Sequence, residues 1–169
     1  MHATRTENIF GAMTLAAADA ITAGAVEGVA RGGATAAALN VIGHAAGLSI
    51  DRLARGLGLS HPGTVRLVDG LAAAGLVMRT ASTVDRRSVV LHLTAAGSRK
   101  RRTLLRGRRA ALAGFLAPLD ERERAQLATL AAKLVRSHVT DAPIALATCR
   151  FCDERACDDC PANEALADV

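Results

Sequence analysis

The sequence predicts a mainly α-helical fold with one small β-hairpin. Half of its 169 residues are hydrophobic but only 2% are aromatic, so Ala, Leu and Val must fill the core. Such side chains favour closely packed helices over a sheet sandwich, and apolar residues recur at helical spacing along most of the chain. Two β-prone runs, at residues 76–79 and 88–93, are the exception. The length suits one compact domain, or one domain with an appendage.

Residues 1–47 are expected to form two helices. The first runs from about Thr6 to Arg31, and Gly32-Gly33 is expected to end it. The second covers about residues 35–46 and ends at Gly47. One stripe of the first helix consists of apolar and small residues: Ile9, Met13, Ala17, Ala20 and Gly24. Another helix can approach this stripe closely, which indicates packing within the core.

Residues 48–97 are predicted to form a helix-turn-helix followed by a hairpin. Ser49 is placed to cap a short first helix, and Gly58 permits the tight turn after it. Ser60 is placed to cap a second helix over about residues 61–74. This order suits a protein that lays one helix in the major groove of DNA.

The hairpin is expected to act as a wing beside that helix. Its two strands flank a basic loop that carries Asp85, Arg86 and Arg87. A basic hairpin directly after two helices completes a winged helix-turn-helix, which we take as the fold of this lobe.

This stretch resembles the MarR family of bacterial transcription regulators in the sequence LSIDRLARGLGLSHPGTVRLVDGLAAAGLVMRT…DRRSVVLHLTAAG, from Leu48 to Gly97. The helix-turn-helix, the Asp-x-Arg wing and the Leu-Thr-x-x-Gly exit occur in the family's order. The resemblance implies long N- and C-terminal dimerisation helices, and a homodimer that binds double-stranded DNA at a near-palindromic operator. We expect a repressor. The resemblance also implies a small-molecule effector pocket between the dimer helices and the DNA-binding lobe, where residues 9–24 or 39–48 could line it.

Eight residues are candidates for DNA contact, and five of them open the second helix: Ser60, His61, Gly63, Thr64 and Arg66. Beyond the capping serine, these residues are expected to point away from the core. Gly63 lacks a side chain, so the backbone can approach DNA closely, and Arg66 can reach a guanine edge with two hydrogen bonds. In the wing, the resemblance implies that Arg87 enters the minor groove while Asp85 orients its guanidinium. Arg86 is the alternative.

Residues 98–140 are predicted to complete two long helices. Thr94 is placed to cap the first, over about residues 95–117. Its first half carries a basic run: Arg99, Lys100, Arg101, Arg102, Arg106, Arg108 and Arg109. Like charges four residues apart repel each other, and a polyanion would relieve that repulsion. Part of this run is therefore expected to contact DNA phosphates, which would add affinity without sequence choice.

The last long helix is predicted over about residues 121–138. Asp120 and Glu123 form a capping box at its start. An apolar stripe follows at helical spacing: Leu127, Leu130, Ala131, Leu134 and Val135. Together with the first helix of the chain, this helix is the candidate dimer seam.

Residues 141–169 form a Cys-rich tail with the spacing Cys-x-x-Cys-x4-Cys-x-x-Cys at Cys149, Cys152, Cys157 and Cys160. All cysteines of the chain lie here, which predicts one metal centre on four thiolates; free thiols or reversible disulfides are the plainer interpretation. Paired cysteines are typical of tetrahedral Zn²⁺. However, the spacer is short, neither pair contains Gly, and the last three cysteines with the following proline have ferredoxin-like spacing. We favour an iron–sulfur cluster, with Zn²⁺ as the alternative.

Charge is distributed unevenly along the chain. The net charge is +5, but residues 149–169 carry two Arg against six Asp or Glu, so the tail is acidic and the body strongly basic. A basic body suits a partner that is a polyanion. No apolar run is long enough to cross a bilayer and no signal-peptide pattern is present, so no membrane partner is expected. We expect a cytoplasmic protein, in which thiols stay reduced.

No enzymatic constellation stands out in the sequence. It has no Gly-rich phosphate loop before a helix, no His-Glu-x-x-His, and no nucleophile with a placed base. We therefore expect a regulator and not an enzyme. The alternative is a small redox or electron-transfer metalloprotein whose basic lobe is incidental. DNA binding separates these two hypotheses.

Overall fold

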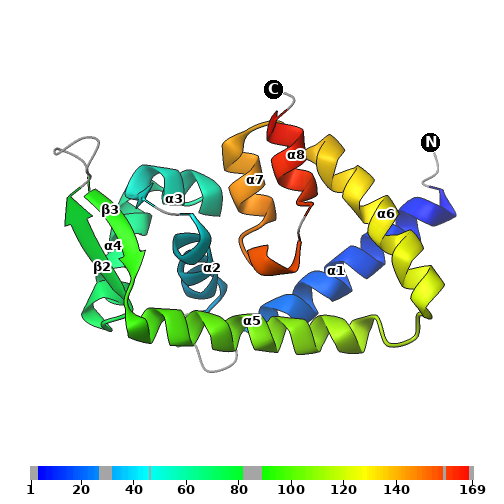
Figure 1. Cartoon of the computed structure of the whole chain (residues 1–169), viewed down its shortest axis with the longest axis horizontal. Coiled ribbons are helices and arrows are strands. Elements are labelled where there is room, and N and C mark those ends of the chain that lie inside the picture. The colour runs from blue at the N-terminus through cyan, green and yellow to red at the C-terminus, as the bar shows by residue number, and fades with distance from the viewer. Residues whose placement is uncertain (1–3, 27–31, 46, 82–88, 158, 168–169) are drawn as a thin grey trace.

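The computed structural model describes residues 4–26, 32–45, 47–81, 89–157 and 159–167. A long helix, α5 (Ala95–Phe115), runs along one side of the molecule (Figure 1). A lobe of short helices and strands lies at one end of α5, while α1 (Arg5–Val26) and α6 (Glu121–His138) lie at the other. The predicted class, mainly helical with a small β-hairpin, is confirmed.

The lobe at the first end has the element order of a winged helix: α2 (Gly32–His44), β1 (Leu48–Ser49), α3 (Ile50–Leu57), α4 (His61–Ala73), β2 (Val77–Ala81) and β3 (Val89–Leu93). Strand β3 lies in the middle of the antiparallel sheet, which has the order β1-β3-β2. The register pairs Leu48 with Leu91 and Val77 with Leu93. Leu48, Leu91 and Val77 are buried in the main hydrophobic core. The sheet therefore closes one side of that core.

Two predictions for this part of the chain need correction. Strand β1 was not expected, because two residues carry no periodicity and their pairing with β3 depends on a segment some forty positions away. Helix α2 begins at Gly32 and not at about residue 35, so the Gly32-Gly33 pair opens a helix instead of ending one. Residues 35–42 are all buried, and such a helix is held by packing on every side more than by local stop signals. The expected end of the first helix at residues 27–31 lies outside the described residues.

Two glycines let α1 and α5 cross at close range. A Cβ added at Gly24 would lie 2.7 Å from the carbonyl oxygen of Gly107, and a Cβ added at Gly107 would lie 2.1 Å from that of Gly24. Both obstacles are backbone atoms, which cannot swing aside. The small residues of α1 thus serve packing within the chain at this point.

The tail folds back onto the body in α7 (Ala142–Thr148), the 3₁₀ turn η1 (Glu154–Ala156) and α8 (Pro161–Ala167). Helix α7 packs against α3, where a Cβ at Gly56 would lie 2.8 Å from Leu146 Cβ. A second small core joins the tail to the end of α6 through Val139, Ala145 and Ala162. Among the described residues, no helix combines the length and hydropathy needed to cross a bilayer.

Candidate functional site

Helix α4 is positioned by local capping on both sides of the turn. Ser49 Oγ accepts a hydrogen bond from the Arg52 amide at 3.3 Å, and Ser60 Oγ accepts one from the Gly63 amide at 3.3 Å. Gly58 ends α3 in the left-handed conformation (φ 63°), which glycine adopts without strain. The turn predicted between the two helices is confirmed.

The start of α4 presents polar groups to solvent. His61 Nδ1 lies 2.7 Å from Asp51 Oδ1 of α3, and both side chains are more than half exposed. Arg66 is also exposed, and it has no hydrogen-bond or ion-pair partner among the described residues. Gly63 lies between them on the first turn. Ser60, His61, Gly63 and Arg66 are therefore gathered at one end of the helix.

Thr64 does not share that face. Its side chain is fully buried, and its hydroxyl donates to the Ser60 carbonyl at 3.1 Å. With Val68 and Leu71 it forms the inner stripe of α4, at positions i, i+4 and i+7. The expectation that Thr64 points outward is wrong, because a small β-branched side chain that satisfies its own hydroxyl fits the inner face.

The wing strands are braced against α4. Arg79 Nη2 of β2 lies 2.7 Å from Asp69 Oδ1 of α4, which fixes the hairpin beside that helix. Asp85, Arg86 and Arg87 lie outside the described residues, so their predicted contacts stay predictions.

The basic run of α5 is partly occupied within the chain. The Arg101 side chain is only 12% exposed, and it pairs with Glu154 of the tail. Its Nε donates to Asn40 Oδ1 of α2 at 2.9 Å. Arg101 is thus not available to a DNA phosphate, whereas Arg99, Arg102, Arg106 and Arg109 remain exposed. The acidic tail supplies part of the anionic charge that this run needs.

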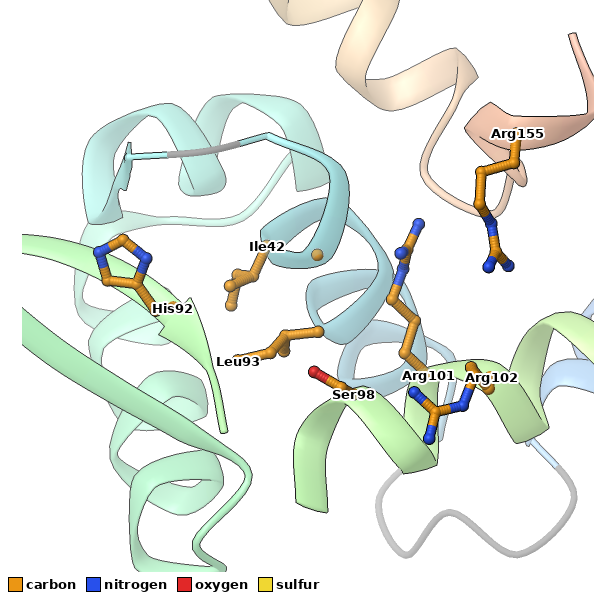
Figure 2. A pocket seen from close by; sticks show the side chains of 8 residues that line it. Ile42, His92, Leu93, Ser98, Arg101, Arg102 and Arg155 are labelled. Atoms are coloured by element: carbon orange, nitrogen blue, oxygen red, sulfur yellow. The ribbon is translucent and has the colours of Figure 1, made fainter. Parts of the chain in front are cut away.

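A pocket of about 340 Å³ lies between the end of α2, strand β3 and the start of α5. Figure 2 shows Arg101 rising from α5 and Arg155 pointing towards it from the tail. His92, Ser98 and Arg102 also line this pocket. Its lining is polar and mostly cationic, apart from Ile42 and Leu93.

Known proteins share both the sequence of the lobe and this architecture. Residues 32–88 match the model of the MarR family. The apo structure of MarR from E. coli is 19% identical with a TM-score of 0.65, and covers 79% of this chain and 98% of its own. The chain has the MarR fold. Proteins of this family regulate transcription and are not enzymes, which agrees with the sequence-based expectation.

Two further relatives carry names or complexes that bear on function. The HTH-type transcriptional repressor MdtR of Bacillus subtilis (strain 168) is 34% identical over 94 residues, which are 56% of this chain and 61% of MdtR. The chain thus matches less than two thirds of that relative's length. FabT of Streptococcus pneumoniae, solved in complex with DNA, is 26% identical with a TM-score of 0.50. That match covers 57% of this chain and 68% of FabT.

A second cavity, of about 530 Å³, is lined by all four cysteines of the tail. Cys149, Cys152 and Cys160 are half-buried, whereas Cys157 is exposed. A hydrogen bond from Cys149 lowers the pKa of Cys152 to about 6; burial opposes this shift, and the charges of Arg108 and Arg150 support it. The same hydrogen bond, together with burial and nearby Cys160, raises the pKa of Cys149. Three of the four sulfurs are therefore already neighbours.

The spacing of the cysteines does not by itself produce coordination geometry. Among the residues that the structure describes, no three His, Cys, Asp or Glu side chains are arranged to hold a metal ion. The predicted four-thiolate centre requires Cys157 to turn inward, so it stays a prediction.

Two further residues lie beside this cavity: His44, a possible ligand residue in the sequence, and Asn40, which sequence reasoning missed. His44 lines the cavity, and its Nδ1 is buried without a hydrogen-bond partner among the described residues. Burial lowers the pKa of His44, and the positive charge of Arg101 acts in the same direction, while Glu154 opposes it. Asn40 is 1% exposed and binds the cysteine loop through its side chain. The available signal was an amide in the middle of an otherwise apolar helix, because a buried amide must find partners.

Proposed function

We propose that this chain is a MarR-family transcriptional regulator that binds double-stranded DNA as a homodimer and acts as a repressor. The observation that carries this proposal is the solvent-exposed start of α4, capped by Ser60 and braced by the wing. Its exposed Arg66 is unpaired among the described residues. Such a helix can enter the major groove while its inner stripe stays in the core. The match to MdtR, a repressor, and the likeness to DNA-bound FabT support the same function.

The homodimer is supported by apolar surface at the end of the molecule away from the lobe. On α1, Ile9, Phe10 and Leu15 are 52%, 47% and 70% exposed, and on α6 Leu130 and Leu134 are 61% and 53% exposed. The chain exposes 10758 Å² in total, whereas a compact monomer of this mass exposes roughly 7,900 Å². A second copy would cover this face and set two α4 helices apart along the DNA.

DNA selection tests the function directly. The purified protein is used to enrich duplexes from a randomised double-stranded library, and the affinity for the enriched sequence is measured at fixed salt. We expect a near-palindromic site whose half-sites lie one helical turn apart, about 34–36 Å. Failure to enrich any sequence would favour the alternative, a redox metalloprotein with an incidental basic lobe. A reporter promoter that carries the selected site should lose output when the protein is co-expressed, and a gain of output contradicts repression.

The pocket of Figure 2 suits a small organic anion as effector. Arg102, His92 and Ser98 line it beside the apolar Ile42 and Leu93, so a carboxylate on an apolar ring would find both kinds of contact. Benzoate, used as the probe, should weaken binding to the selected operator, and the weakening should be reduced in Arg102→Ala. Equal effects on both proteins would contradict this pocket.

A further inference from the structure

The cavity that the four cysteines line is not used by the DNA-binding function. It lies between α2, the end of α6 and the tail. Its apolar wall includes Val135, Pro161 and Ala162, and Cys149 and Cys160 pack against the small core of the tail. The cysteines therefore face a sheltered site near the surface.

We propose that Cys149, Cys152, Cys157 and Cys160 bind one thiophilic metal centre, and that its occupancy sets the affinity of the lobe that carries α4 for DNA. The second half of this proposal rests on the proposed function. The centre is either an iron–sulfur cluster or a zinc ion, since both take four thiolates.

The chemistry of the site favours a metal over isolated thiols. All the cysteines of the chain fall within twelve consecutive residues. The sulfur of Cys149 interacts with those of Cys152 and Cys160, and Cys157 lines the same cavity from its exposed edge. Closing the set requires Cys157 to turn inward and the other three sulfurs to draw together, because no three of the described side chains are yet arranged to hold a metal ion. Each thiol releases its proton when it becomes a ligand, so no oxidant or reductant is needed for binding.

The cysteine loop is bonded to the DNA-binding lobe through Asn40. The Asn40 amide Nδ2 donates to the carbonyl of Cys152 at 2.8 Å and to that of Arg150 at 3.2 Å. Its Oδ1 accepts from Arg101 Nε at 2.9 Å. One buried side chain thus ties together α2, α5 and the loop between the first two cysteines.

A second connection starts between the two cysteine pairs. The η1 turn lies between Cys152 and Cys157, and its Glu154 pairs with Arg101 of α5. Arg101 passes directly over α2, because a Cβ at Gly43 would lie 2.4 Å from its Cδ. A centre that draws Cys157 inward must also reposition η1. Because Glu154 of η1 pairs with Arg101, that change reaches α5, the helix that joins the lobe to the end of the molecule where α1 and α6 lie. Metal binding should therefore fix the lobe and raise its affinity for DNA, since less conformational freedom is then lost on binding.

The first experiment measures the metal. The chain has no Trp or Tyr, so a cluster would dominate its absorption spectrum. Full-length protein is purified anaerobically, analysed for iron, sulfide and zinc, and its stripped form is titrated with Co²⁺ as a spectroscopic probe of thiolate ligation. We expect one centre per chain: iron with sulfide and visible bands identify a cluster, and stoichiometric zinc identifies a zinc site. Cys157→Ser should lose the centre and the Co²⁺–thiolate bands, while the neighbouring Ala156→Ser should keep both. Protein that holds no metal as purified and gives no Co²⁺–thiolate bands overturns the site.

The second experiment measures the coupling. Affinity for the selected operator is compared between metal-loaded and stripped protein at one salt concentration, and we expect loading to tighten binding by about fivefold or more. Glu154→Gln should keep the metal but reduce that ratio. Glu164→Gln is the matched control: it removes the same charge from a tail carboxylate of similar exposure, 43% against 41%, which pairs with Arg136 of α6 and not with the lobe. An affinity that loading leaves unchanged overturns the coupling, and an affinity that loading weakens overturns its proposed direction.

The two parts of the test fail separately. If neither form binds DNA, the proposed function fails, while the metal analysis still decides the site. If both forms bind DNA equally, the function stands and the regulatory role of the centre falls.

Discussion

At the residue scale, Arg66 and Thr64 of α4 lie two positions apart and face opposite ways. Arg66 is exposed and has no partner in the described part of the chain, whereas Thr64 is fully buried with its hydroxyl bonded to the Ser60 carbonyl. One is available to a DNA base and the other holds the helix in the core. Their substitutions should therefore affect different measurements.

Arg66→Ala should weaken binding to the selected operator without changing stability. Loss of a bidentate guanine contact is worth about 1–3 kcal/mol of discrimination, so the preference for the selected sequence should fall more than binding to random DNA. Fluorescence anisotropy on both DNAs at one salt concentration measures this. Arg122→Ala, which removes an exposed arginine from α6, is the control and should change neither affinity. Equal losses on both DNAs would show that Arg66 contacts phosphate only.

Thr64→Val should show the reverse pattern. The variant keeps the shape of the side chain but removes a hydrogen bond that contributes about 0.5–1.5 kcal/mol. The Ser60 carbonyl still accepts from the Thr64 amide at 2.9 Å, so no buried acceptor is left unpaired. Urea unfolding should show a modest loss of stability, with operator affinity per folded molecule unchanged. A loss of operator affinity without a loss of stability would indicate that Thr64 contacts DNA.

At the element scale, the helix boundaries that could be predicted are those set by local chemistry. The capping box of Asp120 and Glu123 starts α6 at Glu121, and Thr94 starts α5 at Ala95, as expected from the sequence. The paired strand β1 and the start of α2 depend on contacts made far along the chain. No local sequence pattern predicts such contacts.

The candidate site divides in the same way. Apart from Thr64, the exposed residues at the start of α4 were predicted from capping and spacing, and the cysteines were singled out by their own pattern. The roles of Asn40 and Arg101 were not, because both depend on a tail that folds back across more than fifty residues. In the sequence, Arg101 is one of seven basic residues in the same run, and only its pairing with Glu154 in the structure distinguishes it from the others.

The crossing of α1 and α5 gives a prediction for an element. Gly107→Ala should destabilise the protein by about 1–3 kcal/mol, because its Cβ would meet the Gly24 backbone at 2.1 Å and the helices would have to separate. Gly114→Ala is the matched control in the same helix, where nothing lies within 4 Å of the added Cβ. Alanine should stabilise that position by up to about 1 kcal/mol through helix propensity. Thermal unfolding measures both, and equal stability of the two variants contradicts the close crossing.

At the scale of the whole molecule, charge and apolar surface are segregated. The acidic tail lies against the basic α5, so part of the positive charge is neutralised within the chain, while Arg66 at the start of α4 stays exposed. Exposed apolar side chains gather on α1 and α6, at the end of the molecule away from α4 (Figure 1). Under the proposed function, DNA binds at one end of α5 and a second copy of the chain binds at the other.

The double variant Leu130→Glu, Leu134→Glu tests that division. No residue of α6 is fully buried within the chain, although this described helix carries an apolar stripe. Two carboxylates on the stripe should therefore leave the fold of one chain intact, because water already reaches both positions.

In a dimer seam the two carboxylates would be buried without partners, and the dimer should dissociate. Light scattering should then give the monomer mass of 17.4 kDa for the variant and twice that for the parent. Operator affinity should fall steeply as well, since a single α4 reads only one half-site. Met78→Glu places one such carboxylate on an exposed apolar residue of β2, 49% exposed, and should keep the dimer mass. A parent protein that is monomeric at working concentration would remove the dimer from the proposed function and leave the apolar stripe of α6 exposed to solvent.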